Sequence, residues 1–209
     1  MHSNFLNFIK MQISSLSQIL WLQLLSIALF LMFFNQINAN NDLANVIIYT
    51  MGLLMLSYLI MRNFMFNDEK YKTKLLFGIL PVTSNIIIGT RGVIVYLFCL
   101  IATPLLVLFS VVTHVIRPEI FAVVQVNILP HGLLLASVFM PIEFLIFQIF
   151  EAQKADIIGA LVFFPYMGLI ALIYKYMMSS SLIFGVIIIA VIANVFVYRI
   201  SVCLYRNKE

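Results

Sequence analysis

Few residues in this sequence could carry chemistry, and none of them forms a catalytic or cofactor-binding motif. No glycine is followed by lysine, so the chain has no GxxxxGK[ST] loop to hold ATP phosphates. It also lacks the HExxH and GxSxG motifs of hydrolases. His114 and His131 have no third ligand at metal spacing, and Cys99 and Cys203 lie far apart with no CxxC. We therefore expect no enzymatic activity, no metal site and no cofactor in this chain.

Glu143 is the one acidic residue inside a long apolar stretch, two positions after Pro141. A carboxylate is costly in lipid, so we expect Glu143 to face the interior of a helix bundle or water. There it could contact cationic groups of a substrate. Alternatively, it could pair with a basic residue at the inner end of its helix, about 12 Å away at 1.5 Å per residue. The sequence leaves both interpretations open.

The composition of the chain is that of a membrane protein. Hydrophobic residues make up 64% of the 209 positions and charged residues only 10%, whereas soluble domains carry roughly 25% charged residues. Six stretches are long and apolar enough to cross a bilayer, and they show no two-residue alternation, so we expect helices. The prediction is an all-α polytopic membrane protein, one domain over residues 1–209, with spans at about 19–38, 43–61, 93–113, 131–150, 157–174 and 182–198.

Two shorter segments complete this outline. Residues 120–130 are apolar but too short for a seventh span, so they are interfacial or extend a neighbouring helix. Residues 1–17 place apolar and polar side chains on opposite helical faces, which predicts an amphipathic helix along the inner membrane surface. The first span lacks a small-x-small cleavage site after it, so we expect it to be retained rather than removed as a signal peptide.

The basic residues predict the orientation. With the N-terminus in the cytoplasm, ten Lys and Arg residues lie inside and two, Arg117 and Lys175, lie outside. We therefore expect a multi-pass protein of the cell membrane with both termini cytoplasmic, and we interpret the net charge of +4 as topology rather than as a nucleic-acid site. The inside set is Lys10, Arg62, Lys70, Lys72, Lys74, Arg91, Lys154, Arg199, Arg206 and Lys208.

The longest loop, residues 63–90, has the densest charge. Acidic residues followed by basic ones suit the dipole of a short helix that begins near Asp68. Pro81 should end that helix, and Thr83 or Ser84 can cap the next one, which runs through Arg91. The loop is therefore an interfacial helix with a solvated edge or a docking surface for a cytosolic partner. The linker 151–156 lies on the same side and is either a plain turn or a second docking point.

Prolines and small residues suggest how the spans pack. Pro104, Pro141 and Pro165 lie within spans, where they are expected to kink the helices and could act as hinges. The pairs at 132–136, 155–159 and 181–185 are small-xxx-small patterns that allow helices to approach closely and could lie on a dimer face.

This layout resembles the ABC-2 type permeases, the membrane subunits of ABC exporters. The resemblance covers essentially the whole chain. It is sharpest from Glu69 to Ser84, where charged residues precede Leu76-Phe77-Gly78-Ile79-Leu80-Pro81-Val82-Thr83, as in the family's coupling helix. Residues 198–206 also resemble the family's ending. Compact chains of this kind are similar to Gram-positive exporters of peptide toxins, including the transporter of phenol-soluble modulins.

The resemblance implies that the chain dimerises and that each copy docks one of two ABC ATPase subunits, which bind the ATP and magnesium. The cargo would be an amphipathic peptide or a lipid-like substrate, moved across or out of the lipid membrane. The first of the two interpretations of Glu143, contact with a substrate, would place it on that path. The expected docking residues are Asp68, Glu69, Lys70, Tyr71, Lys72, Lys74, Leu75, Leu76, Phe77, Leu80, Glu151 and Lys154.

An alternative from another class is a membrane immunity protein that sequesters a toxin or antimicrobial peptide without using energy. A neighbouring ATPase gene would favour the exporter, whereas a lone peptide precursor would favour the immunity protein.

Overall fold

The computed structural model describes residue 10 and residues 42–71, 83–116, 123–150, 152–177 and 182–206. These residues form helices and no strand. Five helices are long and apolar enough to cross a membrane, which confirms an all-α fold and places five of the six expected spans on helices. The first expected span, 19–38, and the amphipathic segment 1–17 lie outside the described residues, apart from Lys10. The five helices are α2 (Asp42–Tyr71), α4 (Ser84–Ile116), α5 (Leu129–Ile149), α6 (Ala152–Met177) and α7 (Leu182–Arg206).

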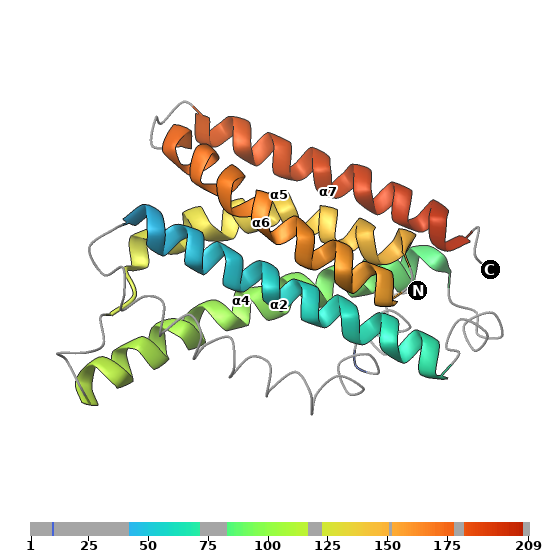
Figure 1. The fold of residues 1–209 in the computed structure, drawn as a ribbon, viewed down its shortest axis with the longest axis horizontal. Helices are drawn as coiled ribbons and strands as arrows, with labels where there is room; N and C mark the ends of the chain where they lie inside the picture. The colour runs from blue at the N-terminus through green and yellow to red at the C-terminus, as the bar shows by residue number, and fades with distance from the viewer. Residues whose placement is uncertain are drawn as a thin grey trace.

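The five helices form a bundle in which each helix runs opposite to the one before it (Figure 1). Helix α5 lies at the centre and packs most extensively against α7 and α2, and also against α6. Helix α2 further contacts α6 and α4, and α4 contacts α7. The C-terminal ends of α2, α5 and α7 therefore lie at the same end of the bundle as the N-terminal ends of α4 and α6. We call this end the basic end.

Burial separates inner helices from outer ones. The buried share of the most apolar stretch is 56% in α2 and in α5. In α6 and α7 the buried share of this stretch is 22% and 17%. Inside the bundle, Gly132 of α5 lies against the ring of Tyr49, and Gly159 of α6 lies against the ring of Tyr58, both on α2. Two of the three small-residue patterns therefore serve packing within the chain. A Cβ added to Gly185 on α7 would meet no atom of another residue within 4 Å, so this glycine does not mark a close approach of two helices within the chain.

Several helices extend beyond the expected spans, and α2 and α4 do so the most. Helix α2 continues to Tyr71, so residues 68–71 form its last turn. Our prediction that a separate helix begins near Asp68 was wrong. The physical reason is that no Pro or Gly interrupts residues 62–71, and Phe64 and Met65 keep the apolar face buried. Helix α4 begins at Ser84, where the Thr83 carbonyl accepts hydrogen bonds from the next turn. The expected start of this helix is confirmed.

Of the ambiguous segment 120–130, the last residues lead into α5, whereas residues 120–122 lie outside the described part of the chain. Residues Val126–Ile128 form a 3-10 turn that leads directly into α5, whose start carries Pro130. Pro104, Pro141 and Pro165 all lie within helices that continue past them, in α4, α5 and α6.

Candidate functional site

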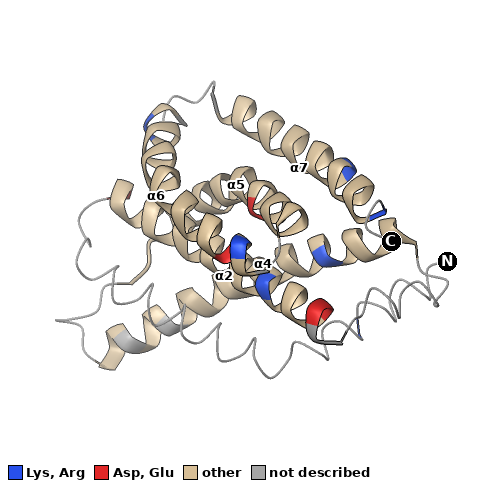
Figure 2. Ribbon diagram, turned by 45° about the vertical axis from the view of Figure 1, so that its right-hand side comes forward, with Lys and Arg blue, Asp and Glu red and all other residues tan. Residues whose placement is uncertain are grey.

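The basic end gathers most of the described charged residues (Figure 2). Arg62, Arg91, Lys154, Arg199 and Arg206 belong to helix segments at this end, whereas Lys175 lies near the opposite end of α6. Of the docking segments expected from the sequence, residues 68–80 and 151–154, residues 72–80 and Glu151 lie outside the described part of the chain. The described members of both segments, Glu69 and Lys154, lie at this end of the bundle.

A buried ion pair joins α2 to α4 at the basic end. The Arg91 guanidinium donates a hydrogen bond to the Asp68 carboxylate at 2.8 Å, and the two side chains are only 1% and 5% exposed. The guanidinium also lies over the rings of Phe64 on α2 and Tyr205 on α7, at 5.3 and 5.9 Å from their centres. Arg91 therefore links three helices at their ends. The sequence indicated only that Arg91 is one of the inside basic residues, because a single Arg gives no sign of burial.

A second polar contact joins α2 to the start of α6. The Asp156 carboxylate accepts hydrogen bonds from the Tyr58 hydroxyl at 2.7 Å and from Arg62 at 3.0 Å. This pair is much more open than the first, since the Arg62 side chain is 53% exposed and that of Asp156 29%. An ion pair in such a position contributes little to stability, about 0–1 kcal/mol. Its role is to fix how α6 begins beside α2.

The expected docking residues fall into three groups. Asp68 is buried against Arg91, so its carboxylate faces the bundle and not the surface that we had assigned to it. Glu69 and Lys154 are exposed at the basic end, and the backbones of Lys70 and Tyr71 complete the last turn of α2. The remaining residues lie outside the described part of the chain: Lys72, Lys74, Leu75, Leu76, Phe77, Leu80 and Glu151.

Glu143 lies inside the bundle, as the sequence predicted. It is 3% exposed and accepts a hydrogen bond from the Ser57 hydroxyl of α2, and its second oxygen, Oε1, has no hydrogen-bond partner. Among the residues that the structure describes, the recorded ion pairs join Arg62 to Asp156 and Arg91 to Asp68. Glu143 is thus partnered by a neutral hydroxyl, which differs from the pairing with an inner basic residue that we had considered.

This environment predicts the effect of neutralising Glu143. Because Ser57 can donate equally well to an amide oxygen, Glu143→Gln is expected to change the free energy of unfolding by less than about 1 kcal/mol, measured by denaturant titration in detergent micelles. Glu143→Ala removes the acceptor and leaves a cavity, and is expected to cost about 2–4 kcal/mol. A large loss in Glu143→Gln would mean instead that a cation pairs with this carboxylate.

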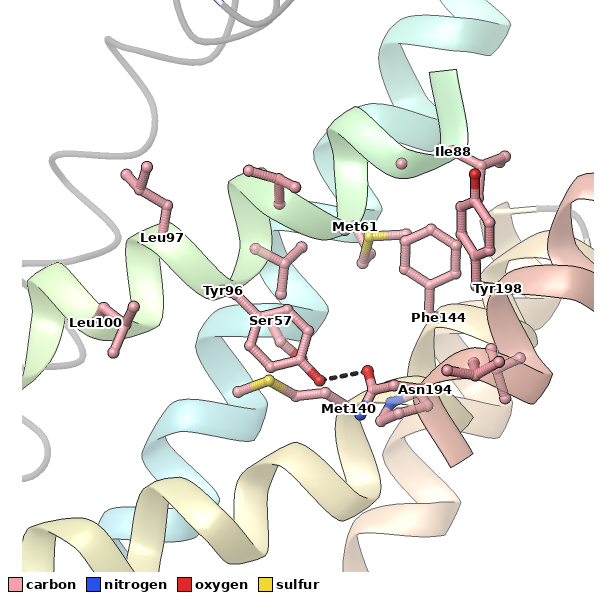
Figure 3. A pocket seen from close by; sticks show the side chains of 17 residues that line it. Ser57, Met61, Ile88, Tyr96, Leu97, Leu100, Met140, Phe144, Asn194 and Tyr198 are labelled. Carbon is pink, nitrogen blue, oxygen red and sulfur yellow. Dashed lines mark hydrogen bonds between the residues drawn. The ribbon is translucent and has the colours of Figure 1, made fainter. Parts of the chain in front are cut away.

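Ser57, which donates to Glu143, also lines a cavity of about 580 Å³. Its walls come from α2, α4, α5 and α7, and most of the lining side chains are apolar (Figure 3). Across it, the Tyr96 hydroxyl of α4 donates to the Asn194 side-chain oxygen of α7 at 2.5 Å. The Asn194 amide in turn donates to the backbone oxygens of Ser137 and Ala190 at 3.0 and 2.8 Å. Asn194 therefore ties α7 to both α4 and α5.

We did not predict this cavity or its polar pair from the sequence. A signal was present, because Asn194 is the one amide in residues 182–198, a stretch otherwise composed of apolar residues, glycine and a tyrosine. Polar side chains within spans hydrogen-bond across helices. What the sequence did not supply was the partner, since Tyr96 lies 98 positions away.

The comparisons with known proteins agree with this architecture. Residues 7–206 match the family model described as ABC-2 family transporter protein. No curated protein and no solved structure gives a significant match to the chain. The family match spans nearly all of the sequence and all of the helices described above, and the helices are long and apolar enough for a multi-pass membrane protein. The chain therefore belongs to the ABC-2 family of transporter proteins and is a membrane-spanning permease subunit of an ABC transporter.

Proposed function

We propose that this chain is the permease of an ATP-driven exporter of amphipathic peptides in the cell membrane. Two copies associate and each docks one ABC ATPase subunit, which binds the ATP and magnesium and carries out hydrolysis. The chain itself contributes no catalytic group. Both termini and the basic end face the cytoplasm, in keeping with the excess of Lys and Arg there.

The observation that carries this proposal is the buried Asp68–Arg91 pair. It joins the last turn of α2 to the first part of α4, and these helices flank the part of the segment 68–80, expected to contact the ATPase, that lies outside the described residues. A movement imposed on that segment reaches both helices at once because their ends are bound together. Arg91 also touches Tyr205 of α7, so the same movement reaches the last span.

The nature of the cargo is supported by the outer helices and by the likeness to peptide-toxin exporters. Helices α6 and α7 expose large apolar side chains along much of their length, for example Phe164 and Phe184 at 76% and 75%. Such faces suit lipid, a second copy of the chain or the apolar side of an amphipathic peptide. An exporter that moves amphiphiles between two copies would use them in this way.

Charge reversal at Lys70, Lys72 and Lys74 tests the docking. We expect the triple Glu variant to lose most co-purifying ATPase from native membranes, identified by mass spectrometry, and to lose peptide export. The matched control reverses Arg117 and Lys175, the two basic residues expected outside, and should keep both properties.

Two results would contradict the proposal. One is a triple variant that retains full ATPase association and export. The other is protection of cells against a peptide in the absence of any ATPase, which would support the energy-independent immunity protein instead.

A further inference from the structure

The cavity between α4 and α7 opens toward the surroundings of the bundle. Its rim carries apolar side chains that are themselves exposed: Val93, Leu97 and Leu100 of α4 and Val195 of α7. Figure 3 shows Leu97 and Leu100 on α4, beyond Tyr96 and at the end of the drawn stretch away from Ile88. Both helices have the hydropathy of membrane spans. In a bilayer that both helices span, a cavity mouth with this apolar rim would border the hydrocarbon.

The polar groups in the cavity are already bonded to one another or to the backbone. Tyr96 donates to Asn194, Asn194 donates to two backbone oxygens, and Tyr198 donates to the Asn85 backbone oxygen at 3.3 Å. Ser57 donates to Glu143. An occupant of this space is consequently met by apolar surface and by satisfied polar groups, which suits a hydrocarbon chain better than a polar molecule.

The position and length of the cavity match one leaflet of a bilayer. Its lining residues on α4 run from Ile88 to Leu100, a distance of about 18 Å at 1.5 Å per residue. Half of a hydrocarbon core of about 30 Å is about 15 Å. The cavity begins near the first turn of α4, at the basic end, so a chain inside it would have its polar headgroup at that end.

A positively charged side chain, Arg199, follows the cavity-lining residues of α7 at the basic end. Tyr198 lines the cavity, and the next residue, Arg199, is exposed. The recorded ion pairs of the described residues do not include Arg199. Arg206 follows two turns later on the same helix and is also exposed. Basic residues at the cytoplasmic level of a span bind anionic lipid headgroups.

We propose that the cavity between α4 and α7 binds one acyl chain of an anionic membrane phospholipid, with the phosphate of its headgroup against Arg199. The chain fills the space between the two helices beside the Tyr96–Asn194 hydrogen bond. This lipid is distinct from the exported cargo, and its binding requires neither the ATPase nor ATP.

Gly92 provides a direct test, because it lines the cavity and a Cβ added to it meets no atom within 4 Å. Gly92→Leu should fill the cavity without disturbing the helices. Gly168→Leu on α6 is the matched control, since a Cβ there also meets nothing within 4 Å and the residue does not line this cavity. The full chain, purified in detergent and stripped of lipid, is titrated with phosphatidylglycerol or phosphatidylcholine of the same acyl chains and examined by native mass spectrometry.

We expect the wild-type chain and Gly168→Leu to bind one phosphatidylglycerol at least fivefold more tightly than phosphatidylcholine. Gly92→Leu should weaken this binding about tenfold, and the exposed substitution Arg199→Gln should abolish the preference for phosphatidylglycerol while leaving the fold intact. The proposal is overturned if Gly92→Leu binds as the wild type does, if Arg199→Gln keeps the preference, or if the wild-type chain takes up no lipid because another segment of the protein fills the cavity. Failure of the ATPase experiment above would leave these results unaffected.

Discussion

Replacing Arg91 by Met is expected to lower the free energy of unfolding by about 3–5 kcal/mol, the range for breaking a buried ion pair. The substitution removes the hydrogen bond to Asp68 and the contacts with the rings of Phe64 and Tyr205, while the Asp68 carboxylate stays in the interior. Denaturant titration of the purified protein in mixed micelles measures this change. Transport should fall with it, because α2 and α4 are no longer joined beside residues 72–82.

The Arg62–Asp156 pair is the matched control, since it lies at the same end and also joins α2 to another helix. Arg62→Met is expected to cost no more than about 1 kcal/mol because both side chains are partly exposed. A double-mutant cycle with Asp68→Asn and Asp156→Asn separates the pairwise energies. If the coupling energy of Asp68 with Arg91 does not exceed that of Asp156 with Arg62, the buried pair does not hold the helices together.

Gly132→Ala should be more damaging than alanine at Gly89, Gly92, Gly159, Gly168 or Gly185. The added Cβ would lie 2.2 Å from Cδ1 of Tyr49, a separation that the two atoms do not tolerate. Tyr49 is 3% exposed, and its hydroxyl lies 2.6 Å from that of Thr103 on α4. The ring therefore moves only by breaking this contact, or α5 moves away from α2. We expect a loss of about 1–3 kcal/mol in unfolding free energy, typical of overpacking.

Gly168→Ala measures the effect of the methyl group itself, because its Cβ meets no atom within 4 Å. It is expected to leave the unfolding transition nearly unchanged. Gly159→Ala should be intermediate, since the Cβ would lie 2.5 Å from the Tyr58 ring, which is only partly buried and has more room to turn. Equal stabilities of Gly132→Ala and Gly168→Ala would show that α2 and α5 do not approach as closely as described.

Some features of the candidate site could be predicted from sequence patterns and others could not. The start of α4 at Ser84 and the burial of Glu143 were predictable, because capping residues and intramembrane carboxylates act locally. The end of α2 was not, since the acidic and basic residues after position 67 resemble the beginning of a helix as much as its last turn. Burial of Phe64 and Met65 against neighbouring helices decided in favour of continuation.

By itself the sequence determined that the protein is helical, crosses the membrane several times and carries most of its basic residues at one end, since these follow from the length of apolar stretches and the distribution of the few charges. Only the tertiary structure decided that Asp68 pairs with Arg91, that Ser57 bonds to Glu143, and that Tyr96 meets Asn194 across a cavity. The reason is physical. Spans that are apolar on all sides give no periodic sign of which face packs inward, so contacts between residues 23, 86 and 98 positions apart depend on how the helices pack together.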